Sequence, residues 1–255
     1  MSMPLVIPHR GANVYAPQNT LPAFEKSLEI GVDGFETDVH VTKDGVPVIC
    51  HNYTVDETSN GKGEISSMTL SELRELDFGA YFSPRYKGTK IPTVDEFLSL
   101  VEKSDIPLMN IELKSPKQAE SEIVSLTINA VKEHGLFDRL LISSFDPKLL
   151  IEAKKIDRNC KTGFLYSPDK SIALKMFRQP VEFAKSIGAD ALHPYEYFVL
   201  KEDYVKAAHD AGIMVNPWTV DSDKSIERLI SFGVDGIITN RPDVVKGLIY
   251  KHSEP

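Results

Sequence analysis

Short apolar, β-branched runs alternate along the chain with longer amphipathic stretches, and the alternation repeats eight times. Runs of this kind that are followed by a loop and a helical pattern predict the buried strands of a parallel sheet. The predicted strands are 5–9, 34–39, 107–113, 139–144, 161–166, 190–194, 213–219 and 236–240. The predicted helices are 20–30, 93–103, 117–134, 147–156, 174–187, 201–211, 222–232 and 242–251. Eight such units in 255 residues predict one α/β domain, a closed (β/α)8 barrel of the TIM type that spans residues 1–255.

One segment departs from the repeat. Residues 34–51 have the pattern of a strand, a turn at Asp44-Gly45 and a second strand, which is a strong hairpin signal. With Asp44 and Gly45 as a two-residue turn, Asp38 would lie opposite His51, and the returning arm would bring His51 back to the barrel rim. A slip of one residue would point His51 away from the rim.

A second departure follows at residues 52–90, where turn residues surround a short helical stretch at 69–76. The segment contains no strand-helix unit, so we expect an insertion over the barrel mouth. Its aromatic residues Tyr81, Phe82 and Tyr86 are expected to pack it onto the barrel.

Composition narrows the class of protein. The net charge of −8 argues against a nucleic-acid binder that works by neutralising phosphates. No apolar run is long enough to span a bilayer, and the N-terminal residues do not have the pattern of a signal peptide. The two cysteines, Cys50 and Cys160, lie far apart without zinc-type spacing, which indicates a reducing, cytoplasmic setting.

Acidic side chains recur at the predicted strand ends, where barrel active sites gather. Residues two apart on a strand share a face, so Glu36 converges with Asp38, and Glu112 converges with Lys114. Three carboxylates at one barrel mouth repel each other unless a cation lies among them. Oxygen ligands of this kind favour Mg²⁺ or Ca²⁺.

Basic side chains occur at the same strand ends. His9 and His51 are suited to proton transfer, because the unperturbed pKa of histidine lies near neutrality. Arg10 and Lys114 would supply positive charge to a phosphoryl group. Each pattern alone has a plainer explanation, such as a solvated strand face, a surface histidine or a salt-bridged strand end, but their occurrence together at one rim favours a catalytic site.

The residues at these positions resemble the glycerophosphodiester phosphodiesterases, a family of phospholipase-C-like phosphodiesterases. The resemblance runs in order over nearly the whole chain. It rests on His9-Arg10-Gly11, Ala16-Pro17-Gln18-Asn19-Thr20, Gly34-Phe35-Glu36-Thr37-Asp38-Val39, Thr42-Lys43-Asp44-Gly45, His51, Asn110-Ile111-Glu112-Leu113-Lys114, Ser144-Phe145, Trp218-Thr219-Val220 and Gly236-Ile237-Ile238-Thr239-Asn240.

The resemblance implies an enzyme that hydrolyses a small-molecule glycerophosphodiester to glycerol 3-phosphate and an alcohol. It further implies a role for each site residue. One divalent ion, Mg²⁺ or Ca²⁺, would be held by Glu36, Asp38 and Glu112, with His9 and His51 as the acid/base pair. Phosphate contacts would come from Arg10 and Lys114, and Trp218 would lie at the mouth against the substrate.

Three positions depart from the family pattern. Gln18 stands where a glutamate is usual, Asn52 replaces an aspartate after His51, and Glu57 replaces an arginine. The first two each remove a negative charge, either from the ion's surroundings or from an orienting partner of a histidine. None of the three deletes a proposed ligand or acid/base group.

Three alternatives remain open at the level of sequence. The first is an enzyme of the same fold that acts on lysophospholipid diesters, with the insertion aromatics against an acyl chain. The second is a non-catalytic barrel that binds phosphodiesters. The third is a sugar-phosphate lyase or isomerase, with Lys114 as a Schiff-base lysine or Asn240-Arg241 at a phosphate site.

Overall fold

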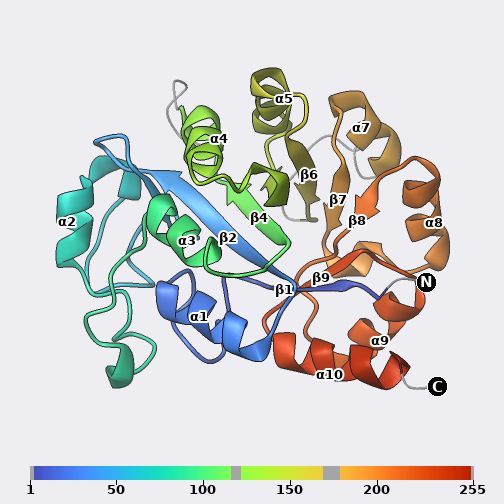
Figure 1. The fold of residues 1–255 in the computed structure, drawn as a ribbon, viewed down its shortest axis with the longest axis horizontal. Coiled ribbons are helices and arrows are strands. Elements are labelled where there is room, and N and C mark those ends of the chain that lie inside the picture. Colours follow the sequence, from blue (N-terminus) through green and yellow to red (C-terminus); the bar gives the residue numbers. More distant parts are fainter. Residues whose placement is uncertain (1–2, 116–121, 169–178, 254–255) are drawn as a thin grey trace.

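Eight parallel strands form the centre of the computed structural model, which describes residues 3–115, 122–168 and 179–253 (Figure 1). These strands are β1 (Leu5–Pro8), β2 (Gly34–Val41), β4 (Leu108–Leu113), β5 (Leu140–Ser144), β6 (Lys161–Tyr166), β7 (Ala191–Pro194), β8 (Met214–Val215) and β9 (Gly236–Thr239). They pair in the order β2-β4-β5-β6-β7-β8, and β1 pairs with β9. The ring continues from β8 to β9, where Asp235 N donates to Val215 O at 3.0 Å and Ile238 N donates to Pro217 O at 3.0 Å. The predicted (β/α)8 barrel is confirmed.

Helices surround this barrel (Figure 1). They are α1 (Leu21–Ile30), α2 (Leu70–Glu75), α3 (Val94–Val101), α4 (Ile123–Glu133), α5 (Pro147–Ile156), α7 (Pro180–Ile187), α8 (Glu202–Asp210), α9 (Asp223–Ser231) and α10 (Pro242–Ser253). Single 3₁₀ turns lie at η1 (Ile65–Ser67), η2 (Pro84–Tyr86), η3 (Phe137–Arg139) and η4 (Glu196–Phe198). The early residues of the helices predicted at 117–134 and 174–187 include positions outside the described residues. No helix in the described ranges is both long and apolar enough to cross a bilayer.

The hairpin after β2 has a different register from the one predicted. β3 (Pro47–Ile49) runs antiparallel to β2 with Val39 opposite Ile49, and Thr42 N donates to Val46 O at 3.0 Å. The loop between Thr42 and Val46 therefore has three residues, and Gly45 takes a φ of 82°. A three-residue hairpin loop that ends in a left-handed residue is a common alternative to the two-residue turn. The slip does not remove His51 from the rim, because the regular strand ends at Ile49 and the chain bends at residues 51–53.

The insertion at 52–90, which contains α2, packs beside the hairpin (Figure 1). A small apolar cluster joins it to the flanking segments and is formed by Val48, Cys50, Val55, Ile65, Leu73, Phe78 and Ile91. Two of these residues belong to the hairpin arm, so the insertion is anchored on the same segment that delivers His51.

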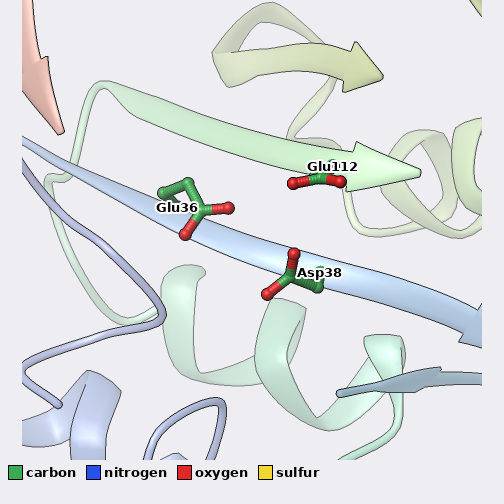
Figure 2. A group of neighbouring side chains, drawn as sticks. All are labelled: Glu36, Asp38 and Glu112. Atoms are coloured by element: carbon green, nitrogen blue, oxygen red, sulfur yellow. The ribbon is translucent and has the colours of Figure 1, made fainter. Parts of the chain in front are cut away.

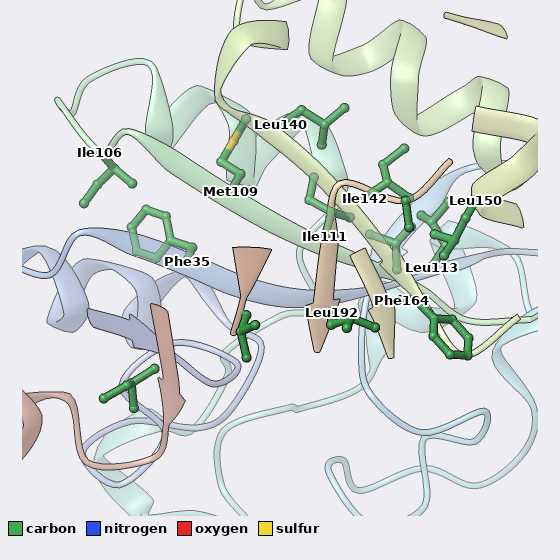
Figure 3. Close-up of a cluster of buried hydrophobic side chains, with 14 of the residues drawn as sticks. Phe35, Ile106, Met109, Ile111, Leu113, Leu140, Ile142, Leu150, Phe164 and Leu192 are labelled. Carbon is green, nitrogen blue, oxygen red and sulfur yellow. The ribbon is translucent and has the colours of Figure 1, made fainter. Parts of the chain in front are cut away.

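Strand alternation separates the main core from the site. On β4, Met109, Ile111 and Leu113 face the surrounding helices, where they join a large apolar cluster with β5 side chains such as Leu140 and Ile142 (Figure 3). The residues between them, including Asn110 and Glu112, therefore point into the barrel. The same rule applies on β2, where Phe35 packs against the helices within an aromatic cluster with Phe24 and Phe97. The helix-facing side chains thus fix the direction of the acidic ones.

Candidate active site

Three carboxylates from neighbouring strands meet inside the barrel mouth. Glu36 and Asp38 lie on β2 and Glu112 lies on β4, and Figure 2 shows their carboxyl groups turned toward one another. Asp38 and Glu112 are directly paired residues in the parallel ladder. One oxygen from each of the three lies within 4.8 Å of the others, and all three residues are buried. Oxygens at this spacing form a pocket suited to a hard divalent cation.

Two cationic side chains reach the same cluster. Lys114 Nζ lies 2.6 Å from Asp38 Oδ1 and 2.6 Å from Glu112 Oε1, and Arg10 Nε lies 3.5 Å from Asp38 Oδ2. Although burial opposes it, the charges of Lys114 and Arg10 lower the pKa of Asp38. Burial, followed by repulsion from Asp38 and Glu112, raises the pKa of Glu36 well above its ordinary value. Three carboxylates therefore face two cations, and a further positive charge is needed to keep all three ionised.

The turn after β1 aims its backbone at the cluster. Arg10 takes a φ of 60°, and its backbone N–H donates to Glu36 Oε2 at 2.8 Å. Gly11 follows with a φ of 75°, and a Cβ at Gly11 would lie 2.8 Å from the Cβ of Ala23. Only glycine fits there without a shift of α1, so the His-Arg-Gly sequence is required by the turn as well as by its side chains.

One histidine, His9, belongs to the turn after β1, and the other, His51, follows the hairpin arm. His9 Nδ1 is 2.9 Å from Asn240 Oδ1, and His51 Nδ1 is 2.6 Å from Asn52 Oδ1. Desolvation, with help from the nearby Arg10 charge, lowers the pKa of His9 to about 3. Desolvation lowers the pKa of His51 to about 4. In the protein without substrate or ion, both rings are therefore neutral at pH 7.

A cavity of about 240 Å³ opens beside the carboxylates. One side is polar, with His9, Arg10, Glu36, His51, Asn110 and Glu112; the other is mainly apolar, with Phe145, Leu165, Ser167, Trp218 and Ile238. Trp218 is fixed by its Nε1–H, which donates to His193 O at 2.7 Å, and its ring meets that of Phe145 edge-on at 5.5 Å. The cavity thus combines a charged wall with a wall suited to the carbon atoms of a small ligand.

The structure brings the residues predicted from sequence to one mouth. Six of them line the cavity, and Asp38 and Lys114 lie directly behind the wall formed by Glu36 and Glu112. A third histidine, His193 on β7, is completely buried inside the barrel.

Sequence reasoning missed the partners of the site residues. Asn240, which lies next to His9, is 231 positions away in the chain, and Asn110 belongs to the family motif but was given no role. The amide of Asn110 is buried and has no hydrogen-bond partner among the described residues. Strand parity places Asn110 on the face of Glu112, and this signal could have identified it as a site residue.

The three residues that depart from the family pattern form side-chain hydrogen bonds near the site. Gln18 Oε1 accepts a hydrogen bond from Arg10 Nη1 at 2.7 Å. Asn52 contacts both His51 and Glu57, so two of the three departures touch each other.

Comparisons with known proteins give one consistent result. The model of the "Glycerophosphoryl diester phosphodiesterase family" matches residues 9–244. A protein of Caldanaerobacter subterraneus subsp. tengcongensis named glycerophosphodiester phosphodiesterase is 39% identical over 247 residues, which cover 97% of this chain and 98% of the relative. A solved Oleispira antarctica phosphodiesterase in complex with the product sn-glycerol-3-phosphate is 28% identical, with a TM-score of 0.87 over 97% of each chain. The glycerophosphodiester phosphodiesterase of Thermotoga maritima is 28% identical, with a TM-score of 0.75 over 97% of this chain and 100% of that one.

Proposed function

Because this chain belongs to the glycerophosphoryl diester phosphodiesterase family and hydrolyses glycerophosphodiesters, we propose that the reaction takes place at the barrel mouth. There Glu36, Asp38 and Glu112 would hold a divalent ion, either Mg²⁺ or Ca²⁺. The products would be an alcohol and glycerol 3-phosphate, the molecule with which the Oleispira relative was solved.

The observation that carries this proposal is the buried carboxylate cluster. Its oxygens lie within 4.8 Å of one another, and the buried amide of Asn110 lines the same cavity without a partner in the described part of the chain. Buried polar atoms in proteins are generally hydrogen-bonded or bound to a ligand, so an unpaired amide beside three carboxylates favours a site for ion and substrate. A bound divalent ion would offset the charge of the phosphate and polarise its phosphorus atom.

The chain's own residues would then bind and orient the diester. The side chain of Arg10 is 18% exposed at the cavity wall, where its guanidinium can contact a phosphate oxygen. Lys114 lies behind the carboxylates and would act through charge. Its ammonium is held between Asp38 and Glu112, and their charges raise its pKa against the effect of burial. A lysine kept protonated in this way is a poor Schiff-base nucleophile, which disfavours the lyase and isomerase alternative.

The histidines would move the protons. His9 and His51 both line the cavity that the carboxylates face. One would remove a proton from the attacking oxygen and the other would protonate the leaving alcohol. Trp218, held edge-on to Phe145, would pack against the carbon atoms of the substrate.

A second cavity supports a two-part binding site for the diester. It measures about 520 Å³ and shares His9 and Arg10 with the first cavity. Its other lining residues are Asn13, Val14, Gln18, Tyr81, Phe82, Asp221, Asn240 and Arg241. A phosphate beside His9 and Arg10 would therefore have room on both sides, one for the glycerol and one for the alcohol.

The larger cavity also gives a reason to keep the lysophospholipid alternative. Val14 and Tyr81 line it and are respectively 53% and 42% exposed, which is high for large apolar side chains. Such a rim could contact an acyl chain. Release of glycerol phosphate from micellar lysolipid, and not from water-soluble glycerophosphocholine, would favour this alternative.

We also propose a reducing, cytoplasmic setting. Cys50 and Cys160 are both free and buried thiols. Burial raises the pKa of each to about 11, so neither is a reactive thiolate at neutral pH.

The test of the proposed function is an assay of the purified protein with glycerophosphocholine and glycerophosphoethanolamine. Glycerol 3-phosphate would be measured in EDTA, in added Mg²⁺ and in added Ca²⁺. We expect release that depends on the metal and that is absent from the Glu36→Ala variant. A folded protein that releases nothing with either ion would refute the proposal for these substrates.

A further inference from the structure

Each of the two histidines at the mouth is backed by the same sequence of groups. His9 Nδ1 meets Asn240 Oδ1 at 2.9 Å, and Asn240 Nδ2 donates to Asp221 Oδ2 at 2.7 Å. The second chain of contacts is built from other residues, since His51 Nδ1 meets Asn52 Oδ1 at 2.6 Å and Asn52 Nδ2 donates to Glu57 Oε2 at 2.7 Å. The two His–Asn–carboxylate chains share no residue, yet they place the same donors and acceptors in the same order.

The carboxylate fixes the direction of each chain. An ionised carboxylate only accepts hydrogen bonds, so the asparagine must turn its NH₂ group toward it. The amide oxygen then faces the histidine, and because that oxygen also only accepts, the histidine Nδ1 must carry a proton. A flipped amide would set oxygen against oxygen at the carboxylate. In a neutral imidazole with its proton on Nδ1, the other nitrogen, Nε2, is an acceptor.

The His9–Asn240–Asp221 hydrogen bonds are reinforced by further contacts. Asp221 Oδ1 accepts from the backbone N of Asn240 at 2.8 Å and from Thr239 Oγ1 at 3.1 Å. Asn13 Nδ2 donates to Asn240 Oδ1 at 2.5 Å and to His9 O at 3.0 Å. Loss of one contact would leave the others in place.

The His51–Asn52–Glu57 hydrogen bonds have no such reinforcement within the described residues. Glu57 is exposed, and its carboxylate accepts only the hydrogen bond from Asn52 among the contacts of the described ranges. Asn52 Oδ1 likewise meets only His51 Nδ1 there. The orientation of the Asn52 amide therefore depends on Glu57, which makes this the chain that substitutions can test.

We propose that Asn52 and Glu57 are positioning residues that hold His51 with its proton on Nδ1 and leave Nε2 as the acceptor, as Asn240 and Asp221 do for His9. The proposal rests on the proposed function, in which both histidines serve the reaction. With Nδ1 protonated in both rings, Nε2 of the histidine that acts as the base can take the proton from the attacking oxygen, and the other histidine, once it carries a second proton on Nε2, can give that proton to the leaving oxygen. A histidine with its proton already on Nε2 could not accept there.

The first test reads the tautomer directly, by ¹⁵N NMR of histidine-labelled, metal-free protein in EDTA at pH 7.5. His9→Gln and His51→Gln variants would assign the two rings by the loss of their signals. We expect both rings to show the Nδ1–H tautomer. In Glu57→Gln the terminal amide can donate as well as accept, so Asn52 can turn over, and the His51 signals should shift toward the Nε2–H form while the His9 signals stay unchanged.

The second test measures kcat and KM with glycerophosphocholine and the preferred metal. Because partners behind a functional histidine typically contribute about 10- to 100-fold, kcat should fall by at least about 10-fold in Glu57→Gln and in Asn52→Leu, with KM little changed. Glu75→Gln is the matched control, since it removes an exposed glutamate from the same insertion without touching a histidine contact. Its kcat should equal that of the parent.

Exchanging the charges of positions 52 and 57 tests whether these residues position His51 or only stabilise the fold. Asn52→Asp alone would set two carboxylates against each other, whereas Asn52→Asp with Glu57→Gln restores a donor at position 57 and an acceptor toward His51. The double variant should keep the Nδ1–H tautomer and recover kcat to within a few-fold of the parent, well above Asn52→Asp alone. An Nε2–H signal for His51 in the parent, or full activity in both Glu57→Gln and Asn52→Leu, would overturn the proposal. A parent protein without activity would instead refute the proposed function, and the NMR arm would still decide the tautomer.

Discussion

The barrel interior contains two buried polar clusters that are built very differently. On β2 and β4, Glu36, Asp38 and Glu112 keep their carboxyl groups within 4.8 Å of one another. Across the barrel, His193 on β7 and Asn216 just after β8 form a buried pair, with Asn216 Nδ2 3.2 Å from His193 Nε2. Burial lowers the pKa of His193 to about 3, so this second cluster is neutral at pH 7.

The difference indicates which constraint shaped each side. The neutral pair has no charge to desolvate, although His193 Nδ1 is buried without a hydrogen-bond partner in the described part of the chain. Gly163 leaves room for the ring, since a Cβ there would lie 2.6 Å from His193 Nε2. A buried set of three carboxylates and two cations is instead expensive to desolvate. Proteins retain such groups at functional sites at the expense of stability. Substitutions on the acidic side should therefore change activity, and substitutions on the His193 side should change stability.

The largest expected effect is on the acidic side, in a Glu36→Gln variant. The amide introduced by this substitution would keep an acceptor for Arg10 N but lose a ligand charge, and with several kcal/mol of charge stabilisation at stake kcat should fall at least about 10³-fold. The unfolding temperature of the variant in EDTA should not fall, and relief of repulsion worth about 1 kcal/mol would raise it by about 2–4 °C. Calorimetry together with the glycerol phosphate assay checks both. A large loss of stability would contradict the division between the two sides.

The next largest expected effect is a difference between the mouth histidines, His9 and His51, and the buried His193. His9→Ala and His51→Ala should each lower kcat by at least about 10²-fold, the usual scale for general acid/base catalysis. His193→Ala should keep kcat within a few-fold of the parent but lower the free energy of unfolding by about 2 kcal/mol or more, as other large-to-small core substitutions do. A loss below about 10²-fold at either mouth histidine would remove that residue from the mechanism.

A smaller effect concerns how stability depends on pH. His193 is neutral in the folded protein down to a pKa of about 3, whereas an unfolded histidine takes up a proton near 6.5. The unfolded state therefore gains protons first as the pH falls below 6.5, and the folded state is destabilised progressively down to pH 3. Between pH 8 and pH 5 this should cost about 2 kcal/mol. Urea unfolding of His193→Leu at these pH values should show a correspondingly weaker dependence, and equal slopes would show that His193 is not the group responsible.

Most of the fold could be predicted because its signals are local and repeated. Apolar runs followed by amphipathic stretches correctly indicated all eight barrel strands. The predicted strand 213–219 is shorter in the structure, where the regular strand covers Met214–Val215 and an isolated parallel bridge pairs Trp218 with Tyr195. The hairpin register was wrong by one residue, because two-residue and three-residue turns both accommodate Asp44-Gly45.

The candidate site could be predicted only where strand parity and strand ends determine direction. Those rules place Glu36 with Asp38 and Glu112 with Lys114, and the family resemblance gives their expected roles, which stay predictions. They do not reveal contacts between segments far apart in the chain. Asn240 and Asp221 lie behind His9 only because β1 and β9 are neighbours in the closed barrel.

The smallest expected effect is on KM and concerns Gln18, at the edge of the acidic side, which accepts a hydrogen bond from Arg10 Nη1 at 2.7 Å. Gln18→Glu would add one negative charge beside the cavity that binds an anionic diester. An exposed charge interaction of about 0.5–1 kcal/mol corresponds to a KM increase of about 2- to 5-fold.

The cause of that increase can be separated by salt, because ions screen a charge effect but not a steric one. The KM ratio between Gln18→Glu and the parent should approach one as NaCl rises from about 0.02 M to about 0.5 M, while the kcat values remain within about two-fold of each other. Gln18→Met, which loses the hydrogen bond without adding a charge, is the control, and its KM ratio should not depend on salt. A salt-independent increase in Gln18→Glu would mean that Gln18 acts by shaping the Arg10 side chain, and that its missing charge has no part in binding.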